Sequence, residues 1–224
     1  MTDPGLFQTL YTTRALRRFK PDPIPDDVLF QVLDAGIRAS SGQNAQDWRF
    51  LVITDPAVKA KLQEWALEGW ARYQARFGTQ EAIDALPRSQ RLSLNSVRDL
   101  SHTIGKVPVV LGVLGLKGRH STPGGSVFPA VQNIQIAARA LGLGSSIFNL
   151  PFGHKDELLT MLNIPENNEL YCLLPMGYPT DKQGPVKRKP LRDVVYWEKF
   201  GERWPFAEQQ PATGYQDKWV PPQS

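Results

Sequence analysis

The sequence predicts an α+β fold in which amphipathic helices flank a central buried sheet. Apolar residues recur at helical spacing in several segments, of which 28–37 is the clearest. Three other apolar runs, 50–53, 107–116 and 169–177, lack that period and are typical of strands. Because the second run is almost uninterrupted, we expect both faces of its strand to be covered.

Length and composition limit the classes of protein to consider. The 224 residues, 41% hydrophobic and 21% charged, make one globular domain with a sizeable core, or at most two small ones. No apolar run reaches the roughly 20 residues of a membrane span, and the first residues do not resemble a signal peptide. The single cysteine, Cys172, excludes an intramolecular disulfide, so we expect a cytoplasmic protein.

The polar inventory argues against two kinds of site. Three well-separated histidines and one cysteine do not match a zinc site, so no metal is expected. The net charge of +4 is too small to indicate nucleic acid as a partner. The positive residues gather in 14–20 and 182–192, which either meet around one phosphate or form two solvated faces.

The first half of the chain predicts helices separated by a proline-broken segment. A short helix is expected over 6–11, and 14–25 must be extended because three prolines interrupt it. Two aspartates then favour the start of a helix that runs from residue 26 to about 39. The sequence Thr54-Asp55-Pro56 opens the next helix with a capping side chain and a proline. Its aromatic stripe, which ends at Phe77, either packs in the core or borders a substrate cavity.

The region that follows is the most polar part of the interior of the sequence. Residues 78–87 break the long helix, and 88–100 are helical again. The stretch 74–95 is either a mobile cover over an active site or a peripheral helical excursion.

A further helix is predicted over 127–141 and ends at Gly142. The segment 142–146 is not a dinucleotide-binding loop, because such a loop follows a strand and opens a helix. A short strand or loop is expected over 147–151, and then a helix over 155–162.

The loop 40–46 is the segment with the strongest functional signal. It joins a helix to a buried strand and contains Ser, Gly, Gln and Asn in close succession. Such uncharged donors and acceptors suit a planar polar ligand, a ribityl chain or a phosphate better than acid–base chemistry. An ordinary polar turn is the alternative, which composition alone favours.

Three motifs in order resemble the nitroreductase family of FMN-dependent oxidoreductases. They are Arg14-Ala15-Leu16-Arg17, the stretch 39–48, and the pair Gly177-Tyr178-Pro179 with Arg188-Lys189-Pro190-Leu191. Ser40 and Asp47 stand where the family usually has proline, and Ala15 where it often has serine. The resemblance covers about residues 12–195.

The resemblance implies a nitroreductase-like fold and a function. The sheet would be mixed and mainly antiparallel, the protein an intertwined homodimer with two FMN sites at its interface, and residues 1–196 the FMN-binding domain. Hydride would pass from NADH or NADPH to flavin N5 and then, by a ping-pong route, to a nitroaromatic or quinone-like small aromatic acceptor. Because this step needs no general acid or base, we name no catalytic residue.

The resemblance also assigns cofactor-binding residues. Arg14, Ala15 and Arg17 would contact the ribityl phosphate and the pyrimidine side, and Arg188 and Lys189 the phosphate. A surface charge is the alternative for each arginine, which the agreement among the motifs disfavours. Asn149 and Leu150 match the region that faces flavin N5. The loop residues that would reach the FMN of the other subunit are Ser40, Ser41, Gly42 and Asn44.

Two other readings stay open at this stage. The same fold can support different flavin chemistry, such as reductive dehalogenation or flavin destruction, or the protein can be a non-catalytic flavin store. A nucleic-acid-binding module is disfavoured, because the aromatic residues fall mostly at core helical spacing. The sequence does not distinguish NADH from NADPH or name the physiological acceptor.

The segment 197–224 carries six aromatic residues among several prolines. We expect an extended arm that packs on the partner subunit, since large aromatic side chains are seldom left in solvent. A tail folded back on its own chain is the alternative. The aromatic residues are Trp197, Phe200, Trp204, Phe206, Tyr215 and Trp219.

Overall fold

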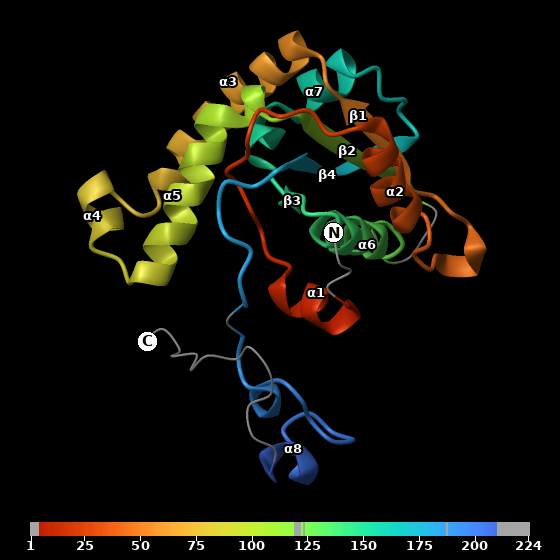
Figure 1. Ribbon diagram of the computed structural model, residues 1–224, viewed down its shortest axis with the longest axis vertical. Helices are drawn as coiled ribbons and strands as arrows, with labels where there is room; N and C mark the ends of the chain where they lie inside the picture. The colour runs from red at the N-terminus through yellow and green to blue at the C-terminus, as the bar shows by residue number, and fades with distance from the viewer. Residues whose placement is uncertain (1–4, 119–121, 123, 187, 210–224) are drawn as a thin grey trace. The chain divides into compact units, whose positions relative to one another are not determined.

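The computed structural model describes residues 5–118, 122, 124–186 and 188–209 (Figure 1). The chain divides into two compact units. The larger comprises residues 15–182, and the described part of the smaller joins 5–14 to the segment from 183 to 209.

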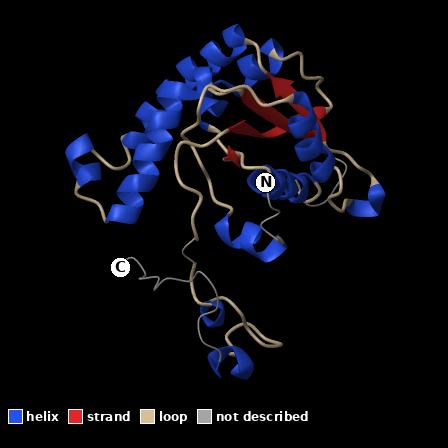
Figure 2. Cartoon of the chain, viewed as in Figure 1, coloured by secondary structure: helices blue, strands red, loops and turns tan. Residues whose placement is uncertain are grey.

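The larger unit is built on a four-stranded antiparallel sheet with strand order β1-β2-β4-β3 (Figure 2). In the register, Leu111 of β2 lies opposite Val52 of β1 and Leu174 of β4. Every residue of β2 is buried except the last, which confirms that both faces are covered. The strands are β1 (Arg49–Ile53), β2 (Val109–Leu116), β3 (Gly144–Ser145) and β4 (Asn168–Gly177).

Helices α2 (Asp26–Gly36) and α6 (Val127–Ala140) cover one face of this sheet. Their apolar residues at helical spacing, among them Val32 and Ile134, pack on alternate residues of β2 and β4. A side chain at Gly36 would place its Cβ 2.7 Å from a carbon of Ile134. The glycine therefore allows the two helices to pack closely.

The other face is covered by α3 (Pro56–Gln74), α5 (Arg88–Thr103) and α7 (Lys155–Met161). Figure 1 shows α3 and α5 side by side. The Asp55 carboxylate caps α3 by accepting from the backbone N–H of Ala57 at 2.7 Å, as the sequence predicts. The aromatic stripe is largely core, because Trp65 and Trp70 are buried.

Several element boundaries differ from the prediction. Helix α2 ends at Gly36 rather than near residue 39, and the expected break contains a short helix, α4 (Gln80–Asp84), capped by Thr79. The two-residue strand β3 was not predicted, because so short a strand has no periodic signal. The remaining short helical turns are η1 (Gly42–Asn44), η2 (Ile104–Lys106) and η3 (Leu150–His154).

The smaller unit contains α1 (Leu6–Thr12), η4 (Leu191–Asp193) and α8 (Pro205–Gln209). The Val186 N–H donates to the Tyr11 carbonyl at 3.1 Å, which joins α1 to the segment that begins at residue 183. None of the described helices in either unit has the length and apolar character needed to cross a membrane.

The described part of the C-terminal segment is folded into turns rather than extended. The Trp197 and Trp204 rings stack with centroids 5.7 Å apart, and Tyr196 forms an isolated bridge with Arg203. Within the described residues the aromatic side chains therefore pair locally, and the extended arm expected over 197–224 stays a prediction. Tyr215 and Trp219 lie outside the described residues, and packing on a partner stays a prediction.

Candidate functional site

The first predicted motif is held along the edge of the sheet at β3 and the end of β4. The Leu16 N–H donates to the Ser145 carbonyl at 3.0 Å, and the Lys20 N–H to the Tyr178 carbonyl at 2.8 Å. Leu16 is buried against Gly144, where a Cβ would lie 2.9 Å from a Leu16 carbon. Ala15 and Arg17 therefore have fixed positions on either side of an anchored residue.

Arg17 is a partly buried cation, and one of its hydrogen-bond donors has no partner among the described residues. Its Nη1 donates to Ser96 Oγ of α5 at 3.1 Å. Its Nε is buried and has no hydrogen-bond partner among the described residues. Burial lowers the pKa of Arg17, against the opposing effect of nearby Tyr73, but an arginine keeps its charge at neutral pH. A buried, charged donor of this kind can bind the polar edge of a ligand.

Arg18 has a structural role instead. Its guanidinium reaches Asp99 of α5 at 2.6 Å and Asp181 at 3.2 Å. Burial alone would lower the pKa of Arg18, but the hydrogen bonds and charges of these two carboxylates raise it. This arginine ties α5 to the anchored segment.

The segment 146–150 lies beside β4 and forms the second part of the site. The Phe148 N–H donates to the Leu173 carbonyl at 2.9 Å, and Asn149 Oδ1 accepts from the Leu173 N–H at 3.2 Å. The Asn149 side chain thus continues the sheet hydrogen bonding where the backbone turns away. Ser146 Oγ is fully buried and has no partner among the described residues, which makes it a second spare polar group.

Helix α3 supports this segment from the other side. A Cβ at Gly69 would lie 2.3 Å from the Leu150 carbonyl oxygen, so only glycine allows the turn to approach so closely. Asn149 itself remains exposed, and Leu150 is half-buried.

The polar loop 40–46 is fixed by a different set of bonds. The Gly42 N–H donates to Ser126 Oγ at 3.2 Å, and the Gln46 N–H donates to Ser41 Oγ at 3.0 Å. Three non-glycine residues, Gln43, Asn44 and Gln46, have positive φ angles of 54, 54 and 52°. Such backbone costs about 1 kcal/mol or more per residue, so the loop is not an ordinary turn. Ser40, Gly42 and Asn44 are exposed.

The remaining predicted residues, Arg14, Arg188 and Lys189, belong to the smaller unit and are exposed. The hydrogen bond between Tyr11 and Val186 brings their two segments together within that unit. The larger unit holds the other eight predicted residues. It joins Ala15 and Arg17 to the strand that leads to Asn149 and Leu150, and it anchors loop 40–46 separately through Ser126.

Sequence reasoning missed two residues of the site. Ser146 was passed over as part of a glycine-rich stretch, although a serine between two apolar runs is itself a signal for a buried polar group. Ser96 could not be found, because its role depends on the contact between α5 and Arg17. Burial raises the pKa of the Cys172 thiol to about 12. Among the described residues, no three or more His, Cys, Asp or Glu side chains are grouped so that they could hold a metal ion.

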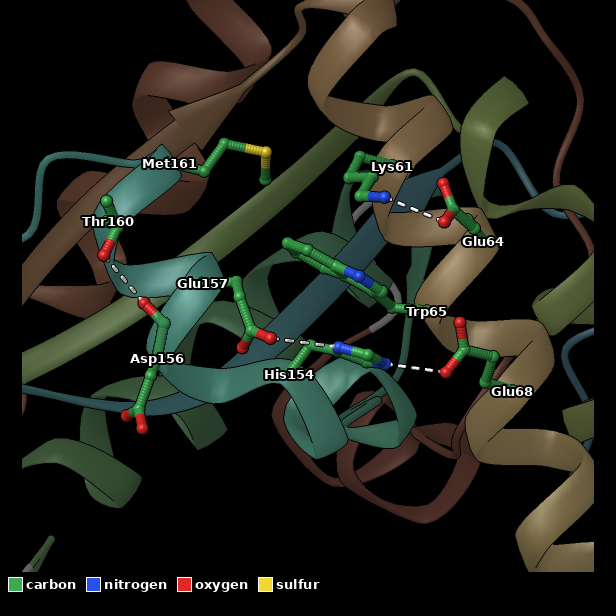
Figure 3. A pocket seen from close by; sticks show the side chains of 9 residues that line it. All are labelled: Lys61, Glu64, Trp65, Glu68, His154, Asp156, Glu157, Thr160 and Met161. Atoms are coloured by element: carbon green, nitrogen blue, oxygen red, sulfur yellow. Dashed lines mark hydrogen bonds and ion pairs between the residues drawn. The ribbon is translucent and has the colours of Figure 1, made fainter.

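A separate pocket of about 670 Å³ opens between α3 and α7 (Figure 3). None of the predicted cofactor residues lines it. The lining residues are Lys61, Glu64, Trp65, Glu68, His154, Asp156, Glu157, Thr160 and Met161.

Comparison with known families settles which fold family this geometry represents. The model of the nitroreductase family matches residues 10–178, most of the chain. The chain belongs to the nitroreductase family. The first and second predicted motifs lie inside the matched range, and the pair Arg188 and Lys189 lies beyond it.

Relatives of this nitroreductase-family chain include two named groups. An NADH dehydrogenase of Thermus thermophilus is 29% identical over 190 residues, which cover 82% of this chain and 91% of the relative. An iodotyrosine deiodinase of Danio rerio is 30% identical over 199 residues, which cover 84% of this chain and 66% of the relative.

Solved structures confirm the predicted nitroreductase-like α+β fold. Iodotyrosine deiodinase bound to FMN and 3-iodo-L-tyrosine superposes with a TM-score of 0.70 at 25% identity, covering 88% of this chain and all of that one. A nitroreductase with bound FMN from Desulfitobacterium hafniense has a TM-score of 0.66 at 19% identity, covering 89% of this chain and all of its own. The second likeness shows the fold alone.

Proposed function

We propose that this chain is an FMN-dependent oxidoreductase that takes reducing equivalents from NADH or NADPH and passes them to a nitroaromatic or quinone-like acceptor by a ping-pong route. The observation that carries this proposal is the partly buried side chain of Arg17, whose buried Nε has no partner among the described residues. Membership of the nitroreductase family, and relatives whose structures hold FMN, support the choice of ligand.

The residues present fit FMN. Reduced flavin carries negative charge near N1 and the C2 carbonyl, where a fixed cation stabilises it. Arg17 supplies such a cation, and Ser146 Oγ a further hydrogen-bonding group that is otherwise unsatisfied. Leaving either group buried without a partner would cost about 1–3 kcal/mol, so a ligand that satisfies both is stabilised. Arg14, Arg188 and Lys189 would hold the phosphate, since guanidinium groups match its oxygens.

Bound FMN supplies the redox chemistry by accepting hydride at N5 and giving it up again. The residues of this chain would orient the flavin and the acceptor and exclude water from the site. Asn149 and Leu150, fixed between β4 and α3, would form the wall that faces the flavin ring. Ser40, Ser41, Gly42 and Asn44 belong to a loop that is anchored through Ser126, and we assign them to the FMN of a partner subunit in a homodimer. No general acid or base is assigned.

One alternative chemistry has a specific observation in its favour. The structure of the iodotyrosine deiodinase bound to FMN and 3-iodo-L-tyrosine has a TM-score of 0.70 with this chain, and several of the curated relatives carry the same name. Reductive removal of halide from an aromatic ring therefore remains the second candidate. The region of α4 and α5, which contacts Arg17 through Ser96, is where an acceptor would be selected.

An anaerobic spectrum with two classes of acceptor tests the proposal. The purified protein should be yellow, should bleach when NADH or NADPH is added, and should regain its colour with a nitroaromatic or quinone. Recolouring with an iodinated phenol and release of iodide would favour dehalogenation instead. A yellow protein that neither nicotinamide bleaches would contradict the proposed reductase and favour flavin storage.

A further inference from the structure

His154 is held between two carboxylates from different helices. Its Nε2 lies 2.7 Å from Glu68 Oε2 of α3, and its Nδ1 lies 3.4 Å from Glu157 Oε1 of α7. The imidazole also stacks on the indole of Trp65, with centroids 5.3 Å apart and planes 10° from parallel. Figure 3 shows the ring lying flat beneath Trp65 with one carboxylate at each end. With 25% of its side chain exposed, it can exchange protons with solvent.

His154 is the last residue of η3, the turn that begins at Leu150. The Phe152 N–H donates to the Asn149 carbonyl at 3.0 Å, so this turn is continuous with Asn149. The turn meets α3 twice more before His154: Leu150 lies over Gly69, and Gly153 lies against the Arg72 guanidinium. The contact of His154 with Glu68 therefore closes a clamp that begins at the proposed flavin-facing residues.

The charges that face His154 come from α3 and α7. Glu68 is shared with Arg72 at 3.7 Å, Lys61 pairs with Glu64 at 2.8 Å, and Lys155 pairs with Glu169 of β4. Asp156 also lines the pocket. The nearest groups to the imidazole are thus the Glu68 and Glu157 carboxylates, which favour the imidazolium ion. The hydrogen bond to Glu68 is the largest cause that raises the pKa of His154 above its ordinary value of 6.5, and the same bond lowers the pKa of Glu68.

We propose that His154 is a positioning residue. Held between Glu68 and Glu157, it fixes residues 148–150, which lead into η3, and makes their placement depend on the protonation of the imidazole. That residues 148–150 face the flavin rests on the proposed function. The clamp itself rests only on the contacts of His154, Leu150 and Gly153 with α3.

The direction of the pH effect follows from the donor count. An imidazolium ion donates to both carboxylates, whereas neutral imidazole has one N–H and leaves one carboxylate without a donor. Because the folded pKa is raised, the stabilisation is complete below about 6.5, the unfolded value. It is lost as the pH rises through the folded pKa.

The first test follows hydrogen exchange of full-length protein, with the flavin it retains, against pH. After correction for intrinsic exchange, protection of the Phe148, Phe152 and Leu173 amides should fall about two- to fivefold as the pH rises through the folded pKa, the size expected for a partly exposed ion pair. The variant His154→Gln should show no such step. His102→Gln, a change at an exposed histidine of α5, should behave as wild type and serves as the control.

The second test follows anaerobic reduction of the flavin by NADH over the same pH range. In the wild type, the rate of flavin reduction should fall over the same pH range in which the amide protection falls. In His154→Gln, the rate should show no such pH-dependent fall. An unchanged step in His154→Gln, or no step in the wild type, overturns the inference. If His154→Gln does not fold, Glu68→Ala removes the same contact and is judged by the same criteria.

The two proposals fail in different ways. A protein that binds no flavin contradicts the proposed function, while the exchange step still decides whether His154 holds the turn. A flavin that bleaches normally, with a pH profile that His154→Gln does not alter, leaves the proposed function intact and removes the role of His154.

Discussion

The two polar segments assigned to FMN are built in opposite ways. Residues 145–150 are packed between β4 and α3, and their spare polar group, Ser146 Oγ, is buried. Loop 40–46 keeps its shape by the Ser41 to Gln46 hydrogen bond, one hydrogen bond to Ser126 and a left-handed backbone, and Ser40, Gly42 and Asn44 are exposed. In the proposed site, the segment assigned to the subunit's own flavin is therefore positioned by the core, whereas the loop assigned to a partner's flavin is positioned mainly by its own hydrogen bonds.

The largest effect is expected where the core supports the first segment. Gly69→Ala would place a Cβ 2.3 Å from the Leu150 carbonyl oxygen and push the turn away from α3. Overpacking of this kind typically costs about 1–3 kcal/mol, and the displaced wall should slow flavin reduction by tenfold or more. Stopped-flow reduction and urea unfolding measure both effects.

Ala71→Gly, at an exposed position of the same helix, is the control for helix propensity. Alanine is a better helix former than glycine by about 1 kcal/mol. If Gly69→Ala raised the free energy of unfolding and left reduction unchanged, the close approach of α3 to the turn would not matter.

The phosphate assignment concerns the smaller unit. Arg14→Ala and Arg188→Ala should each weaken FMN binding, since a hydrogen bond to a charged group contributes about 1.5–3 kcal/mol. Flavin retained after dialysis reports the loss, and Arg76→Ala, in the turn after α3, is the control. Full retention of flavin in both variants would show that these two arginines do not bind the phosphate.

A substitution in loop 40–46 should have the smallest effect on the stability of the isolated chain and a measurable effect on dimerisation. Ser41→Ala removes the hydrogen bond to the Gln46 N–H, at a cost of about 1 kcal/mol. If the loop serves a partner's flavin, FMN affinity and dimerisation should weaken together, because a ligand held by two chains stabilises their association. Sedimentation of the apo and holo forms checks this linkage. A monomer carrying one FMN per chain would contradict it.

The sequence alone predicted the elements that have a periodic or capping signal. The structure confirms the buried run of β2 and the Asp55-Pro56 start of α3. It also confirms that α6 ends just before Gly142, a glycine with a φ of 79°. The two residues of β3 were missed because a strand of that length is defined by its partner, β4, and not by its own pattern.

The candidate site was predictable only where a local sequence motif names its residues. The motifs named Arg17, but its neighbour Arg18 carries the same local signal and forms ion pairs with Asp99 and Asp181. Only the placement of α5 separates the two roles. The closeness of Gly69 and Leu150 is likewise invisible in the sequence, because it depends on how α3 meets a turn far along the chain.

We propose that this fold holds FMN through Arg17, which is partly buried. The most direct measurement is the equilibrium binding of FMN to the flavin-free protein, followed by flavin fluorescence, for wild type, Arg17→Ala and Arg18→Ala. We expect one FMN per chain in the wild type, affinity at least about tenfold weaker in Arg17→Ala, and near-normal affinity in Arg18→Ala with a small loss of stability. Equal affinities for wild type and Arg17→Ala, or no binding by the wild type, would contradict it.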